Sequence, residues 1–122
     1  MTTTFIQILR AVARVLAKFA EPNVSGSLTW NGSAYVPTSG SKFDPYAAKW
    51  WSVITTIAEL FDGHQGKISD RQKAYLDRLL FGGMGSFNDF ELDEHRLGPE
   101  ARHTNQELSR LRKELFEQFS RM

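Results

Sequence analysis

The sequence contains no cysteine among its 122 residues. It therefore has no disulfide framework, no thiolate metal site and no cysteine nucleophile, and this composition suits a reducing compartment. Neither sign of charge is in excess, since 15 lysine and arginine residues balance 14 acidic residues to a net charge of +1. A dedicated nucleic-acid-binding protein is expected to carry a strong basic excess, so the composition argues against a nucleic-acid partner.

Long hydrophobic runs are also missing, and no stretch is long and apolar enough to span a bilayer. The apolar segment from Phe5 to Ala20 carries Arg10, Arg14 and Lys18 at helical spacing. A signal peptide instead keeps its basic residues ahead of an unbroken apolar core. We therefore expect an amphipathic core helix in this segment, and a soluble cytoplasmic protein with no membrane partner.

The chain does contain enough apolar material for a core. Hydrophobic residues make up 41% of the sequence and aromatic residues 12%, and the length falls within the range of one compact domain. We predict a single helical domain over residues 1–122. Its expected fold is mainly α, a bundle-like arrangement of about four helices with a small β-hairpin insert.

Apolar periodicity and helix-start signals predict the positions of the four helices. They are expected from Thr4, as the capping residue, to Ala20, from Asp44-Pro45 to about Phe61, from Ser69 to Gly82, and from Thr104 through the C-terminal apolar stripe. Ser69 with Gln72, and Thr104 with Glu107, fit the capping-box pattern. Tyr75 is expected in the core with Leu76, Leu79 and Leu80, and Gly82 is expected to close the third helix in the left-handed conformation.

The segment from Asn23 to Lys42 is rich in serine, glycine, asparagine and threonine. Within it, Asn31-Gly32 separates two short apolar runs, and Asn-Gly is the favoured pair for a tight hairpin turn. Trp30 and Tyr35 flank this turn. Aromatic rings bring much apolar area, so we expect these two to pack on the helices rather than to stand exposed as contact residues.

Three glycines occupy four positions at Gly82, Gly83 and Gly85. A phosphate-binding loop is the first alternative to consider, but such loops follow a strand and usually add a lysine. This segment follows a predicted helix and contains no lysine. We expect instead that the glycines allow a sharp turn and that Phe87, Phe90 and Leu92 dock on the core.

Acidic residues cluster directly after the glycines. If the apolar residues of this segment face inward, the acids form a compact negative patch that can dock a basic partner, and an ordinary solvated turn is the alternative. The spacing does not match a calcium loop. With the two hairpin aromatics, the candidate partner-binding residues are Asn88, Asp89, Glu91, Asp93, Glu94, Trp30 and Tyr35.

No catalytic constellation is visible. His64, His95 and His103 form no His-x-x-x-His pair, and the chain has no nucleophile elbow. We therefore predict no enzymatic activity, no metal and no cofactor. The alternative is a small metal-dependent hydrolase built on segment 89–103, with Asp89, Glu91, His95 and His103 as its residues.

The segment Leu80–Phe90, which reads Leu-Phe-Gly-Gly-Met-Gly-Ser-Phe-Asn-Asp-Phe, resembles a motif of a family of short, uncharacterised bacterial proteins. Members of that family are similar in having a helix, a Gly-Gly-Met-Gly-Ser-(Leu or Phe)-Asn-Asp turn and a charged C-terminal helix. The likeness covers roughly the C-terminal third of the chain. The family carries no established activity, and its type and size imply immunity proteins, which neutralise a cognate toxin by binding it.

These observations favour a protein-binding module that forms a stoichiometric complex with another protein. An immunity protein acting on a basic bacterial toxin is the specific form that we expect. Besides the hydrolase, a helical homodimer subunit remains an alternative, because apolar residues exposed on the first or last helix can pair with a second copy.

Overall fold

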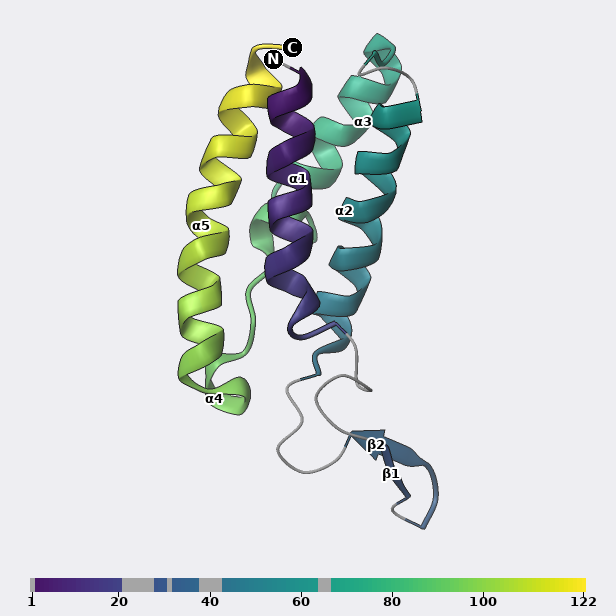
Figure 1. Ribbon diagram of the computed structural model, residues 1–122, viewed down its shortest axis with the longest axis vertical. Helices are drawn as coiled ribbons and strands as arrows, with labels where there is room; N and C mark the ends of the chain where they lie inside the picture. Colours follow the sequence, from purple (N-terminus) through teal and green to yellow (C-terminus); the bar gives the residue numbers. More distant parts are fainter. Residues whose placement is uncertain (1, 21–27, 31, 38–42, 64–66) are drawn as a thin grey trace.

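The computed structural model describes residues 2–20, 28–30, 32–37, 43–63 and 67–122, and Figure 1 shows their course. The elements are α1 (Thr2–Ala17), β1 (Leu28–Trp30), β2 (Tyr35–Pro37), α2 (Pro45–Gly63), α3 (Asp70–Phe81), the 3-10 helix η1 (Phe87–Asp89), α4 (Glu94–Leu97) and α5 (Pro99–Ser120). This helical core confirms the prediction of a mainly α fold. None of the described helices combines the length and the apolarity that crossing a membrane requires.

Helix α1 is the centre of the fold. It packs against both α2 and α5, while η1 contacts α3 and α4 contacts α5 (Figure 1). Residues spaced by three or four along α1 form its buried stripe, as the sequence pattern predicted. They include Phe5, Leu9, Val12 and Leu16, all fully buried. The start of α1 and the end of α5 lie at the same end of the molecule (Figure 1).

An aromatic cluster joins the three long helices at that end. The ring of Phe5, from α1, lies 5.2 Å from the ring of Phe61 in α2 and 5.7 Å from the ring of Phe119 in α5, measured between centroids. All three side chains are buried. Aromatic pairs at such distances add to the stabilisation that burial alone provides.

Two helix starts agree with the sequence signals. Asp44 precedes Pro45, the first residue of α2, and its carboxylate accepts a hydrogen bond from the Tyr46 amide at 2.9 Å. The capping box of α3 is complete, because Ser69 accepts from the Gln72 amide at 3.1 Å while the Gln72 side chain accepts from the Ser69 amide at 2.9 Å. Both predictions are therefore confirmed.

The predicted start of the last helix is wrong. Helix α5 begins at Pro99, after the positive-φ residue Gly98, and proline suits the first helical position because it has no amide to leave unpaired. Thr104 and Asn105 lie inside the helix and are buried. The four-residue helix α4, capped by Asp93, was not predicted and brings the described α-helices to five.

Two details of α3 and the start of α1 also differ from the predictions. The Tyr75 side chain is 60% exposed, since it lies on the outer face of α3 rather than in the core. Gly82 has a φ of −78° and is right-handed, and the first left-handed residue is Gly83, with a φ of 109°. Helix α1 begins at Thr2, so Thr4 is a helical residue and does not precede the helix as its cap.

Of the predicted insert, the structure describes residues 28–30 and 32–37. Strands β1 and β2 pair antiparallel with Trp30 opposite Tyr35. The Trp30 side chain is 56% exposed, so its predicted burial is wrong. Figure 1 shows the reason, because the strands lie beyond the end of the helices, away from their packing faces. Asn31 and the Tyr35 side chain lie outside the described part.

Candidate functional site

The glycine segment folds into a turn closed by its own polar groups. The Ser86 hydroxyl accepts a hydrogen bond from the Gly83 amide at 3.2 Å, and the Asp89 carboxylate accepts one from the Gly85 amide at 3.1 Å. The positive φ angles of Gly83 and Gly85 allow the chain to reverse there. The turn leads into η1 and places Phe87 in the core, with its ring 5.3 Å from the ring of Trp50.

Arg112 holds this turn against α5. Its Nε donates to the Phe87 carbonyl oxygen at 3.2 Å, and its Nη2 donates to the Phe90 carbonyl oxygen. The guanidinium carbon lies 4.8 Å from the centre of the Phe87 ring, a geometry that favours a cation over an aromatic face. Only 7% of Arg112 is exposed. Burial lowers the pKa of the guanidinium, and the negative charge of Glu91 partly opposes that shift.

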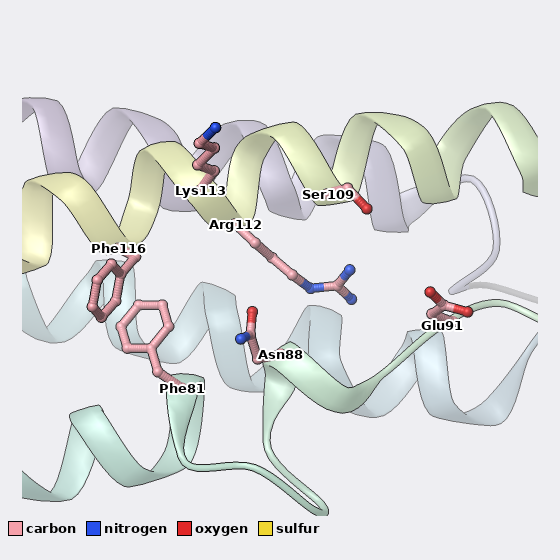
Figure 2. A pocket seen from close by; sticks show the side chains of 7 residues that line it. All are labelled: Phe81, Asn88, Glu91, Ser109, Arg112, Lys113 and Phe116. Atoms are coloured by element: carbon pink, nitrogen blue, oxygen red, sulfur yellow. The ribbon is translucent and has the colours of Figure 1, made fainter.

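Arg112 also lines an open groove of about 460 Å³ between α5 and the residues that follow α3. We call it the Arg112 groove, and its lining residues are Phe81, Asn88, Glu91, Ser109, Arg112, Lys113 and Phe116. Figure 2 shows the Arg112 guanidinium extending between Asn88 and Glu91, while the Lys113 amine points away from them. At the other end, the rings of Phe81 and Phe116 meet edge to face at 5.1 Å.

The candidate residues of the acidic segment divide into two groups. Asn88 and Glu91 line the Arg112 groove, whereas the carboxylates of Asp89, Asp93 and Glu94 accept hydrogen bonds from nearby backbone or side chains. Asp89 closes the glycine turn, and the Asp93 carboxylate accepts from two amides of α4. Their role in partner binding stays a prediction.

Glu94 joins α4 to α5. Its carboxylate accepts from the Asn105 side chain at 3.0 Å and from Arg102 Nε at 3.2 Å. The hydrogen bond from Asn105, followed by that from Arg102, lowers the pKa of Glu94 below its ordinary value of 4.5. Asn105 also bonds both the amide and the carbonyl of Leu92, so this network holds the chain between η1 and α4 on the surface of α5.

The hairpin aromatics do not join the acidic residues. Trp30 and Tyr35 belong to β1 and β2, which lie apart from η1 and α4 (Figure 1). The predicted set of partner-binding residues therefore combines two separate regions of the structure.

The histidines are not assembled into a metal or catalytic site in the described part of the chain. His95 and His103 are exposed, and His103 Nε2 lies 2.9 Å from the Glu107 carboxylate, one helical turn away. His64 lies outside the described residues. Across residues 2–20, 28–30, 32–37, 43–63 and 67–122, no three side chains of the metal-binding types gather into a group.

A second groove was not predicted. It lies between α2 and α3, encloses about 620 Å³, and is lined by Ser52, Val53, Thr56, Ile57, Leu60, Arg71, Gln72, Tyr75, Leu76 and Leu79. We call it the α2–α3 groove. Its sequence signal is present, since the apolar residues of α2 cover more than one narrow stripe and include Val53 and Leu60, both only partly buried.

No protein-family model, no curated protein and no solved structure matches this chain.

Proposed function

We propose that this chain is a protein-binding module that forms a stoichiometric complex with another protein through the α2–α3 groove. The observation that carries the proposal is the apolar lining left open between two helices. Tyr75, at 60% exposure, lies on this groove. Tyrosine is enriched among the residues that dominate binding energy at protein interfaces, because its large ring is buried at low entropic cost.

An amphipathic helix is the partner element that suits such a groove. Helices bind in grooves of this kind by placing apolar residues at intervals of three and four against the lining. Burying the apolar surface of Leu79 and Tyr75 removes it from water, which favours association by about 25 cal/mol per Å². Arg71 and Gln72, also on the groove, supply polar groups beside the apolar contact.

The specific form that we propose is an immunity protein that neutralises a bacterial toxin by occupying it. It is supported by the resemblance of Leu80–Phe90 to the turn motif of that family. Asp89, Glu91 and Asp93 are exposed and can attract a basic partner over a distance. Steering of this kind raises the association rate and weakens as salt is added.

Affinity capture with one matched pair of variants tests the proposal. Tyr75→Glu places a charge in the α2–α3 groove, whereas Tyr46→Glu places the same charge at a tyrosine of α2 that is 66% exposed and does not line that groove. We expect a single protein to co-elute in equal amount with the wild-type chain and with Tyr46→Glu. Tyr75→Glu is expected to weaken the complex roughly 30-fold or more, the effect of losing an interface residue worth about 2 kcal/mol.

Two results would contradict the proposal. If no protein co-elutes in equal amount from a lysate of the organism that makes this chain, the binding function is wrong. If both variants retain the same partner at wild-type affinity, the chain binds a protein but not through this groove.

A further inference from the structure

Arg112 is a buried cation that no carboxylate contacts in the described part of the chain. Two backbone carbonyls accept from its Nε and Nη2, and no ion pair within 4.0 Å joins it to an acid. A buried cation that is hydrogen-bonded only to neutral groups can still gain a charge-assisted hydrogen bond by binding an anion.

The remaining nitrogen of this guanidinium is Nη1, since Nε and Nη2 donate to the two carbonyls. Nη1 takes part in no hydrogen bond with another described residue, yet within residues 2–20, 28–30, 32–37, 43–63 and 67–122 the fully buried side-chain atoms without a partner are the hydroxyl oxygens of Thr55 and Thr104 alone. Nη1 is therefore reached by solvent. Figure 2 shows the guanidinium directed into the space between Asn88 and Glu91, so a ligand in the groove can reach the guanidinium from that space.

The polar groups around Arg112 are of both signs. The Asn88 amide and the Ser109 hydroxyl can donate to an anion beside the guanidinium. The Glu91 side chain lies across from Arg112 (Figure 2) and, like that of Asn88, lines the groove without a hydrogen bond or ion pair to the side chain of another described residue. A simple anion would be repelled by Glu91, whereas a ligand that also carries a positive group would use both charges.

The other end of the groove is apolar. Phe116 is 49% exposed and its ring is held by the edge-to-face contact with Phe81. An apolar side chain of a ligand can therefore lie on the Phe116 ring while its charged end reaches Arg112. The volume of about 460 Å³ is within the range of small-molecule sites.

We propose that the Arg112 groove binds a free α-amino acid with an aromatic or large apolar side chain. The ligand carboxylate lies at Arg112 with Asn88 and Ser109 as further donors, its ammonium group faces Glu91, and its side chain packs on Phe116. This site goes beyond the proposed protein binding, because the Arg112 groove shares no lining residue with the α2–α3 groove.

The probe for this site is L-phenylalanine, titrated into the isotope-labelled full chain and followed by amide NMR shifts. We expect saturable shifts at Asn88, Ser109 and Phe116. Two analogues each lack one charge, since 3-phenylpropanoate has no ammonium group and phenethylamine has no carboxylate. Each is expected to bind at least about tenfold more weakly, because one charge-assisted contact is lost.

Ser109→Glu tests the anion subsite without disturbing the hydrogen bonds of Arg112 to the turn. The new carboxylate can reach the guanidinium and is expected to weaken phenylalanine binding at least about tenfold. Ser120→Glu is the matched control, since it makes the same change at an exposed position of the same helix outside the groove. It is expected to bind phenylalanine as the wild type does.

Glu91→Gln distinguishes a zwitterion site from a simple anion site. We expect it to weaken phenylalanine binding and to strengthen 3-phenylpropanoate binding, since the amide no longer attracts the ammonium group or repels the carboxylate. The proposal is overturned if phenylalanine gives no saturable shifts up to its solubility limit. It is equally overturned if Ser109→Glu binds like Ser120→Glu, or if Glu91→Gln binds phenylalanine more tightly. These outcomes leave the capture experiment on Tyr75 unaffected.

Discussion

Arg112 illustrates how one residue combines a structural and a binding role. The buried stripe of α5 includes Leu108, Leu111 and Leu115, and Arg112 lies four residues after the first of these, on the same face. Helical periodicity alone therefore places this arginine against the core. No sequence signal, however, indicates that the carbonyl groups of Phe87 and Phe90 give the cation its partners.

Glu94 makes stability depend on pH. Hydrogen bonds from Asn105 and Arg102 lower its pKa in the folded state below the ordinary 4.5, so in acid the unfolded chain binds this proton before the folded chain does. Stability from this group is therefore fully present above about pH 4.5 and is lost as the pH falls through the lowered pKa. We expect the free energy of unfolding of the wild type to fall more steeply across this window than that of Glu94→Gln, in urea titrations at several pH values.

Glu114→Gln is the control for this measurement. It also removes one carboxylate that bonds an arginine, Arg110, but that pair joins neighbouring turns of one exposed helix surface and does not connect two elements. Equal pH dependence in the wild type and in Glu94→Gln would show that the Asn105 and Arg102 contacts do not favour the ionised form.

At the scale of elements, the helix starts that depend on local contacts were predicted correctly, and the features that depend on tertiary contacts were not. The starts of α2 and α3 depend on contacts between residues two or three positions apart, such as Ser69 with Gln72, so the sequence contains all the information. Thr104 and Asn105 also have the composition of a helix start. However, α5 already begins at Gly98-Pro99, before these two residues. The Asn105 side chain instead accepts a hydrogen bond from the amide of Leu92, 13 positions away, and donates one to the Leu92 carbonyl oxygen.

The glycine turn provides a test of backbone conformation. Gly83→Ala forces a side chain onto a residue with φ of 109°, although the space for a Cβ is open there. We expect a loss of roughly 1–2 kcal/mol in the free energy of unfolding, the cost of holding an L-residue in such a conformation. Urea unfolding followed by circular dichroism measures it.

Gly63→Ala is the matched control, because a Cβ at this last residue of α2 also meets no atom within 4 Å and its φ is not positive. It is expected to be neutral or slightly stabilising, since alanine limits the unfolded chain more than glycine does. Equal losses in the two variants would mean that the turn can relax to a negative φ at Gly83 without cost.

At the scale of the whole molecule, the Arg112 groove is built from segments that are distant in sequence, whereas the α2–α3 groove lies between two consecutive helices. The Arg112 groove brings Phe81 at the end of α3, Glu91 after η1 and Ser109 in α5 to one place. Asn88 and Glu91 could be predicted as candidates from the sequence, but their position beside α5 could not, because periodicity shows which face of a helix is buried and not which helix covers it. The α2–α3 groove was missed for the same reason.

Truncation of the Phe5 side chain is expected to lower the stability of the whole fold. This side chain is fully buried, and its ring contacts Phe61 of α2 and Phe119 of α5, so Phe5→Ala opens a cavity where three helices meet. We expect a loss of about 3–5 kcal/mol and a fall in Tm of roughly 10 °C or more, measured by calorimetry.

Phe116→Ala removes the same number of atoms from a side chain that is 49% exposed and whose ring, among the described residues, contacts only the ring of Phe81. Water can fill the space that it leaves, so its loss should be well below that of Phe5→Ala. The comparison separates two explanations of stability. If the two variants lose similar amounts, stability follows the amount of aromatic surface. If Phe5→Ala loses far more, stability depends on the junction through which α1 holds α2 and α5 together.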